Sequence, residues 1–304
     1  MRLLAAARVA RVLRLGPAPA KLNLALELTG RRSDGYHEIS AVSQTIDWSD
    51  VVALEGGDHK AGPSPPVPEL QVWGPESERV PLGSDNIAVR AAILLREHGL
   101  GQRISRVALE KRVPPQSGLG GGSADAAAVL RLVAPGADRQ QLESIALQCG
   151  ADVPFSLRGG ACLLEGIGER MTSVPPLREG AFLVVVLAAV ATAAAYAATD
   201  PEDFSDGSRV EHLAMALREG QPLDQDLFGS GLQPAAMRAV PSLGERLGRL
   251  KQATPDVRWA MTGSGGAFFT YQPDPRAAAA LARLVAPACP GATLRVVMPL
   301  AGHL

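Results

Sequence analysis

The sequence contains few cysteines, and this shortage argues against two classes of protein. Only three are present, Cys149, Cys162 and Cys289. They are too few for a paired disulfide framework, and no two lie close enough in the sequence to suggest a shared metal site. We therefore expect them to be reduced, small and buried side chains in a cytoplasmic protein.

Neither sign of charge is in excess. The chain has 30 Lys and Arg residues against 31 Asp and Glu residues, so its formal net charge at pH 7 is −1. A protein that binds nucleic acid or a membrane surface through general electrostatic attraction usually has a marked basic surplus. We therefore expect no nucleic-acid partner and no membrane partner.

Long apolar runs are also missing. No segment reaches the ~18 uninterrupted apolar residues of a membrane span. The nearest, residues 182–198, is interrupted by Tyr and Thr and predicts a buried strand followed by a small-residue loop or helix. The first fifteen residues, with four arginines and no acid, are similar to a targeting segment. Arg8, Arg11 and Arg14 break its apolar part, which favours an amphipathic extension or an over-long gene start.

The remaining pattern predicts a globular α+β protein. The chain is 46% hydrophobic, and its 304 residues suggest two domains or one large domain. Strand and helix patterns are interspersed without an internal repeat, which favours mixed sheets. The predicted strands are residues 17–29, 39–54 with a turn at 47–50, 107–113, a pair within 158–169, 182–190 and 292–298. The predicted helices are 87–98, 124–133, 138–148 and 276–286, and residues 56–69 are predicted to form an exposed loop.

A glycine-rich loop stands between the predicted strand 107–113 and the helix that follows it. It contains Gly118, Gly120, Gly121 and Gly122 and ends at Ser123. Backbone N–H groups without neighbouring Cβ atoms, at a helix N-terminus, form a site for phosphate. Ser123 is a candidate helix cap, or its hydroxyl contacts a phosphate or Mg²⁺. A plain flexible turn is the alternative, since the loop matches neither the Walker motif nor the dinucleotide fingerprint.

Other candidate residues each have a simpler interpretation. Lys21 begins a predicted strand, where a solvated lysine is the usual finding. Tyr36 and His37 follow an Asp-Gly turn and would either bind a ring or begin a half-buried strand. Asp152 precedes Val-Pro, where an aspartate commonly caps a helix or stabilises a turn. A second glycine loop, Gly263–Gly265, lies between two apolar strands.

Taken together, these stretches closely resemble the GHMP kinases, the family of galactokinase, homoserine kinase and mevalonate kinase. The resemblance covers residues 17–196 and 259–269, through PAPAKLNLAL, DGYHE, SDNIAVRAA, VPPQSGLGGGSADAAA, GADVPF and TGSGGAFF. The combination of PAKLN, DGYH and GADVP with the glycine loop is similar to the members that phosphorylate a cytidine-diphosphate-linked methylerythritol. The resemblance implies a ribosomal-protein-S5-like ATP-binding domain over residues 1–172 and a ferredoxin-like domain over residues 173–304.

The resemblance also implies an activity. ATP, with Mg²⁺, would phosphorylate the 2-hydroxyl of the methylerythritol moiety in the non-mevalonate route to isoprenoids. The partners would be these two small molecules, and the chain would be a monomer or a weak homodimer. By position, Lys21 and Asp152 would be the catalytic pair.

The same comparison assigns the binding residues. The ATP-binding residues would be Pro114, Gly118, Leu119, Gly120, Gly121, Gly122 and Ser123. The substrate-binding residues would be Asn23, Tyr36, His37, Thr192, Tyr196, Gly263, Ser264 and Gly265. No metal ligand is assigned. The sequence departs from the family pattern in the Ala-rich residues 187–196 and in residues 228–234, which lack the family's usual polar side chains.

Three rival functions fit these residues less well. A different GHMP kinase, such as homoserine or mevalonate kinase, has no use for a Tyr-His pair that reads a nucleobase. A non-catalytic binding protein needs neither Lys21 nor Asp152. A structural protein has no use for two glycine loops that face one cleft.

Overall fold

The computed structural model describes residues 11–57, 67–100 and 104–302. Most of the predicted N-terminal extension and residues 58–66 of the predicted loop lie outside the described residues. The strands are β1 (Arg11–Arg31), β2 (His37–Gly57), β3 (Glu69–Trp73), β4 (Ile104–Glu110), β5 (Ala161–Gly166), β6 (Arg170–Val174), β7 (Ala181–Val186), β8 (Gly229–Ser230), β9 (Ala260–Met261), β10 (Ala267–Gln272) and β11 (Thr293–Val297). The α-helices are α1 (Ile87–Glu97), α2 (Gly121–Val133), α3 (Arg139–Cys149), α4 (Val153–Arg158), α5 (Thr192–Ala197), α6 (Ser208–Glu219), α7 (Gln233–Ala239), α8 (Pro241–Ala253) and α9 (Pro275–Val285).

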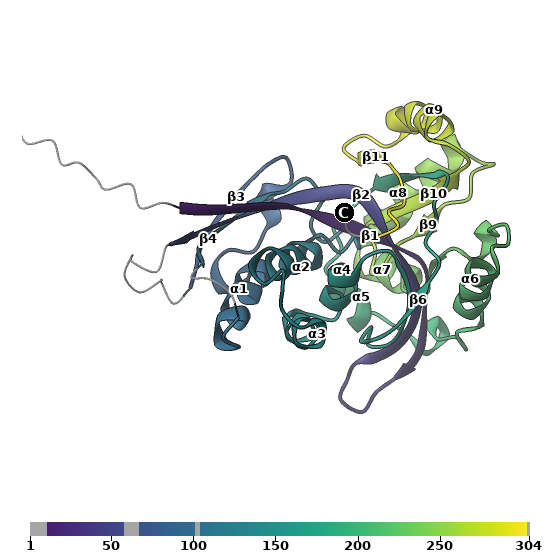
Figure 1. Ribbon diagram of the computed structural model, residues 1–304. Coiled ribbons are helices and arrows are strands. Elements are labelled where there is room, and N and C mark those ends of the chain that lie inside the picture. The colour runs from purple at the N-terminus through teal and green to yellow at the C-terminus, as the bar shows by residue number, and fades with distance from the viewer. Residues whose placement is uncertain (1–10, 58–66, 101–103, 303–304) are drawn as a thin grey trace, which may run out of the picture.

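A long antiparallel hairpin of β1 and β2 runs through the larger sheet (Figure 1). Gly35 allows the tight turn between the two strands because it adopts φ +90°. The sheet runs in the order β3-β4-β2-β1-β8, and β5 pairs with both β2 and β6. The predicted α+β class is confirmed. The strand pair predicted within residues 158–169 is confirmed only for its first strand, β5, because its partner β6 begins at Arg170, after the predicted range.

The predicted turn at residues 47–50 is wrong, because β2 continues through it. The polar side chains that suggested a turn have tertiary partners instead. Asp47 bonds the C-terminal segment, since its Oδ1 accepts the N–H of Met298 at 2.9 Å. Asp50 is fully buried and paired with Lys111. The polar residues at 47–50 therefore bind other parts of the chain and do not form a turn. The register between β1 and β2 is irregular at this position.

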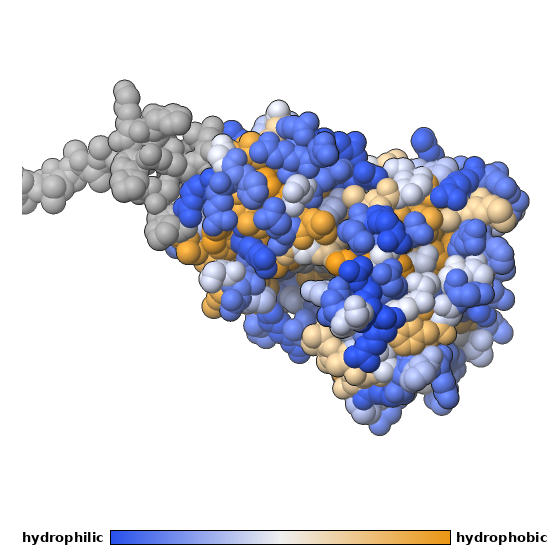
Figure 2. Space-filling model, turned by 90° about the horizontal axis from the view of Figure 1, so that it is seen from below, coloured by the Kyte–Doolittle hydropathy of each residue, from blue (hydrophilic) through white to orange (hydrophobic). Residues whose placement is uncertain are grey.

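Helices α1 to α4 cover one face of the larger sheet (Figure 1). Their apolar sides share one buried cluster with β1, β2 and β4. The predicted helix starts at Asn86 and Asp138 are confirmed, since Asn86 accepts the N–H of Ala88 and Asp138 that of Gln141. Figure 2 views this side of the molecule, where hydrophilic and hydrophobic residues border a central hollow. No helix in the described ranges has both the length and the apolar character needed to cross a bilayer.

The smaller sheet is antiparallel, in the order β11-β7-β10-β9. Phe182 and Phe269 of this sheet pack with Leu22 and Leu24 of β1 in a cluster between the two sheets. Strand β7 ends four residues before the predicted 190, because Val190 turns away to donate its N–H to Gln116 O at 2.7 Å.

The chain crosses between the sheets more than once. Strand β8, which follows the smaller sheet's β7, pairs in parallel with β1 of the larger sheet. Residues 228–234, which departed from the expected pattern, include this crossing strand. Ser230 of β8 donates its hydroxyl to Gly263 O at 2.7 Å and so supports the second glycine loop. The boundary after residue 172 stays a prediction.

Candidate active site

A cavity of about 950 Å³ brings together most of the predicted site residues. It is lined by Lys21, Asn23, Tyr36, His37, Pro114, Gly118, Gly120, Gly121, Gly122, Ser123, Asp152, Thr192, Tyr196, Gly263 and Ser264. Two predicted residues do not line it. The Leu119 side chain is fully buried in the core, and Gly265 turns the second loop behind the cavity wall. Leu119 still contributes through its backbone, since its carbonyl accepts the N–H of Lys21 at 2.9 Å.

The first glycine loop leads directly into helix α2. Gly120 is the N-cap residue in a left-handed conformation, φ +70°, and it has no side chain to cap the helix. The N–H groups of Gly121, Gly122 and Ser123 therefore lack intrahelical acceptors, and the helix dipole adds positive potential there. The predicted role of Ser123 as the cap is wrong, because the helix begins two residues before it. This open helix end lines the cavity and suits a phosphate.

The two glycine loops contact each other through their backbones. A Cβ at Gly118 would collide with Thr262 O and lie 3.1 Å from Gly265 O. A Cβ at Gly263 would lie 2.7 Å from Gly118 O. The loops are also joined by the Ala267 N–H, which donates to Ser117 O at 3.0 Å. Glycine is therefore required at this seam by space as well as by positive φ.

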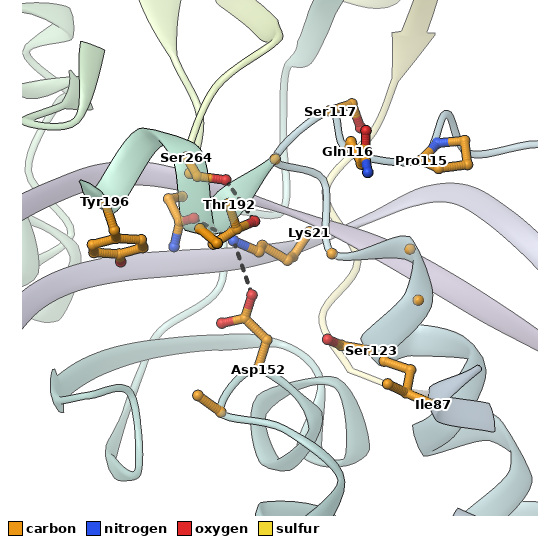
Figure 3. Close-up of a pocket in the computed structure, with 18 of the residues that line it drawn as sticks. Lys21, Ile87, Pro115, Gln116, Ser117, Ser123, Asp152, Thr192, Tyr196 and Ser264 are labelled. Atoms are coloured by element: carbon orange, nitrogen blue, oxygen red, sulfur yellow. Dashed lines mark hydrogen bonds and ion pairs between the residues drawn. The ribbon is translucent and has the colours of Figure 1, made fainter. Parts of the chain in front are cut away.

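Lys21 and Asp152 form an ion pair across the cavity, with 3.6 Å between Nζ and Oδ2 (Figure 3). The solvated-lysine interpretation is wrong, because Lys21 is only 5% exposed. Its Nζ also donates to Asn23 Oδ1, and Asn23 is held in turn by Ser43 Oγ at 2.7 Å. The ammonium group is thus fixed on two sides and points into the cavity.

Asp152 keeps its carboxylate available to a ligand. It is the N-cap residue of α4, but its side chain accepts no capping hydrogen bond, so the cap interpretation is wrong. The side chain is 41% exposed. In Figure 3 the Lys21–Asp152 pair lies between Tyr196 on one side and Ser123 on the other.

An aromatic group surrounds His37. The rings of Tyr196 and Phe204 lie 5.1 and 5.8 Å from its ring, centroid to centroid. Burial, together with the charge of Arg31, lowers the pKa of His37 below its usual 6.5, so the imidazole is neutral at pH 7. Burial, and then the charge of Asp152, raises the pKa of Tyr196, so its phenol stays protonated. Phe204 was not among the predicted residues, and Tyr36 is largely exposed at the cavity mouth.

Thr192 and Ser264 join the Ala-rich segment to the second glycine loop. Their hydroxyl oxygens are 3.0 Å apart (Figure 3). Thr192 is the first residue of the short helix α5, which also carries Tyr196. One helix therefore places a hydroxyl and an aromatic ring along the same cavity wall.

The structure adds residues that the sequence did not single out for this site. Asn86, the N-cap residue of α1, lines the cavity beside Ile87. Lys111 and Asp125 line it as well, although each is only 3% exposed. Burial raises the pKa of Asp125 to about 7, an effect that the charge of Lys111 opposes and that of Asp50 reinforces. The sequence did offer a signal for this pair, because Lys111 precedes the glycine loop and Asp125 follows it.

Comparison with known proteins agrees with this geometry. Residues 86–160 match the family model described as the GHMP kinases N terminal domain. The 4-diphosphocytidyl-2-C-methyl-D-erythritol kinase of a Polaromonas species is 38% identical over 84% of this chain and 82% of its own length. The chain belongs to the GHMP kinase family. The enzyme of the same name from Granulibacter bethesdensis is 37% identical over 88% of each chain.

Solved structures of GHMP kinases share the fold. A crystal structure of 4-(cytidine 5'-diphospho)-2C-methyl-D-erythritol kinase matches 93% of this chain and 98% of its own, with 34% identity and a TM-score of 0.68. Homoserine kinase from Cytophaga hutchinsonii matches with a TM-score of 0.67 at 17% identity. The second likeness concerns the fold alone, because so low an identity does not carry a substrate with it.

The seam between the glycine loops gives a first prediction. Gly118→Ala should raise the KM for ATP by about ten-fold or more, because the new Cβ forces the two loops apart at a position with positive φ. Steady-state kinetics measures this change. Gly136→Ala is the control, since a Cβ there meets nothing within 4 Å. Unchanged kinetics in Gly118→Ala would contradict the assigned contact.

Asp125 gives a prediction about pH and stability. Its carboxyl titrates near 3.8 when unfolded and near 7 when folded. The folded state holds that proton more tightly, so the resulting stabilisation is complete below about pH 4 and is lost as pH rises through about 7. Asp125→Asn does not titrate, so its melting temperature relative to the wild type should increase from about pH 5 to about pH 8.5. The exposed Asp256→Asn is the control, and its difference in melting temperature from the wild type should not change with pH. A difference that is likewise independent of pH for Asp125→Asn would refute the assignment.

Proposed function

We propose that this chain transfers the γ-phosphoryl group of ATP to the 2-hydroxyl of 4-diphosphocytidyl-2-C-methyl-D-erythritol, a step of the non-mevalonate route to isopentenyl diphosphate. One observation carries the proposal. The Lys21–Asp152 pair lies between the open N-terminus of α2 and the aromatic group around His37. Phosphate donor and nucleobase-linked acceptor would therefore meet at this pair.

The pair supplies what phosphoryl transfer requires. Asp152 accepts or orients the proton of the attacking hydroxyl, a contribution of about 10²–10⁴-fold in rate for a well-placed base. Lys21 stays near the transferred group and offsets its developing negative charge. Because Asn23 and Asp152 both hold the ammonium, the charge is in place before the substrates bind.

The nucleotide phosphates occupy the open end of α2. The N–H groups of Gly121, Gly122 and Ser123 face a cavity where negative charge is favoured. Mg²⁺ would be bound chiefly by the nucleotide phosphates, whose charge it would offset, and the Ser123 hydroxyl would be its candidate protein contact. Among the described residues no cluster of three His, Cys, Asp or Glu side chains suits a metal ion by itself, which is in keeping with an ion held chiefly by phosphates.

His37 has the hydrogen-bonding character needed to read cytosine. Thr199 donates its hydroxyl proton to Tyr196 O at 2.9 Å, so at the 3.0 Å contact it must accept from His37 Nε2. In a neutral ring Nδ1 is then an acceptor, suited to the 4-amino group of cytosine. The rings of Tyr196 and Tyr36 offer faces for the base.

The rival functions are less well supported. Homoserine and mevalonate contain no nucleobase, so the aromatic group around His37 would have no ring to bind in a kinase for either of them. A binding protein without catalysis would not need a buried lysine paired with a half-exposed carboxylate. A cytoplasmic setting also fits the chain, since all three cysteines are free and buried.

Removal of the carboxylate tests the mechanism. Asp152→Ala should lower kcat by about 10²-fold or more and leave the affinity for ATP within about three-fold, because the group acts on the acceptor hydroxyl. An ADP-release assay with the cytidine-linked substrate, beside homoserine and mevalonate, measures both rate and choice of acceptor. Asp138→Ala, at a helix cap that does not line the cavity, is the matched control. Near-normal kcat in Asp152→Ala would rule out this mechanism.

The proposed cytosine contact gives a separate test. His37→Ala should raise the KM for the cytidine-linked substrate by about ten-fold and that for ATP by less than about two-fold. In the wild type, the acceptor KM should also rise as pH falls through the lowered pKa of His37, since a protonated Nδ1 no longer accepts. This pH effect should vanish in His37→Ala. Equal changes in both KM values would contradict the assignment.

A further inference from the structure

A buried cluster of three charged residues lies beneath the first glycine loop. Lys111 Nζ contacts Asp50 Oδ2 and lies 2.6 Å from Asp125 Oδ2. The three side chains come from β2, from the residue after β4 and from α2, and none is more than 3% exposed. Asp125 Oδ1 has no hydrogen-bond partner among the described residues. Two carboxyl groups therefore share a single ammonium group.

Asp50 also holds the backbone that enters the loop. Its Oδ1 accepts the N–H of Arg112 at 2.6 Å and the N–H of Val113 at 2.8 Å. The next two residues are Pro114 and Pro115, which have no N–H to donate. These two bonds are therefore the last that backbone N–H groups of this strand end donate before the two prolines. Trp48 Nε1 also donates to Arg112 O, at 2.8 Å.

The first turn of α2 rests on the same cluster. A Cβ at Gly121 would lie 3.1 Å from Val113 Cγ1 and 3.4 Å from Asp50 Oδ2. Gly121 has no positive φ, so the space, and not the backbone conformation, is what a side chain would lack here. Asp50 thus bonds the entrance to the loop and lies close to the helix end that follows it.

We propose that Asp50 is a positioning residue for the nucleotide, which sets the entrance of the glycine loop at a fixed place relative to the first turn of α2 through its two backbone hydrogen bonds. This proposal rests on the proposed function only in assigning phosphates to the loop. The charge on Asp50 serves mainly to pair Lys111, whereas its Oδ1 does the positioning. A displacement of about 1 Å in such a cradle is enough to weaken phosphate contacts strongly.

Two substitutions of similar volume separate these two roles. Asp50→Leu removes both acceptor oxygens, and Asp50→Asn keeps an oxygen at Oδ1 for the Arg112 and Val113 N–H groups. Both leave Lys111 paired with Asp125, so neither creates an unpaired buried ammonium. In Asp50→Asn the amide Nδ2, a donor, replaces the oxygen that accepts from Lys111, and the melting temperature measures the resulting loss of stability. If Asp50→Leu does not fold, Asp50→Ala removes the same oxygens without adding atoms.

The readout is the affinity for ATP and for ADP by calorimetry, together with melting temperature and steady-state kinetics. We expect Asp50→Leu to weaken nucleotide binding about ten-fold or more and Asp50→Asn by less than about three-fold, with the acceptor KM little changed in both. Leu250→Ala, in a fully buried position of α8, is the control for loss of stability alone. A ten-fold loss in Asp50→Asn, or an Asp50→Leu that binds nucleotide as Leu250→Ala does, would overturn the proposal.

Calorimetry with the nucleotide alone needs no acceptor. If the cytidine-linked compound proves not to be the substrate, the nucleotide affinities still decide whether Asp50 positions the loop. Conversely, normal turnover of that compound with unaltered affinity in Asp50→Leu would remove the positioning role and leave the proposed function intact.

Discussion

The close contact of two glycine loops is the constraint on which the site depends. Gly118 precedes the helix whose open N-terminus lines the cavity, and Gly263 lies in the turn between two strands of the smaller sheet. Because neither residue has a side chain, the two backbones meet directly, and hydrogen bonds from residues 190 and 267 hold the first loop in place. Both sheets thereby contribute to the wall of a single cavity. Any added atom at this seam would separate the groups that the chemistry needs close together.

The two buried lysines near this seam, Lys21 and Lys111, are paired with carboxylates of different exposure. Lys21 has a half-exposed carboxylate partner, so the pair stays open to a ligand. Lys111 lies between two fully buried carboxylates, and its pKa is raised because their attraction outweighs the effect of burial. A buried ion is tolerated only when it is paired, and the position of the partner decides its use. The first pair faces the cavity, where the proposed function places the reacting groups, and the second lies beneath the loop.

Local signals in the sequence predicted many of the secondary-structure elements. Asn86 and Asp138 preceded helices because their side chains bond N–H groups of the following turn, an interaction complete within a few residues. The same reasoning failed where the partner lies far along the chain. Asp47 and Asp50 suggested a turn, yet Met298 and Lys111 satisfy them within a continuous strand. Ser123 suggested a cap, but the preceding glycines are themselves helical, because their place in α2 is supported by packing on β2 and Val113.

The sequence by itself determined the fold class, the two glycine loops and, through the family motifs, the set of candidate residues. These features depend on short-range preferences: glycine tolerates positive φ, and caps and alternating apolar residues act over a few positions. Only the tertiary structure decided that Lys21 is buried against Asp152, that Phe204 joins His37, and that Asp50 holds the loop entrance. Each of these contacts depends on which distant segments pack together. The charge or polarity of a single residue does not indicate which distant residue it will contact.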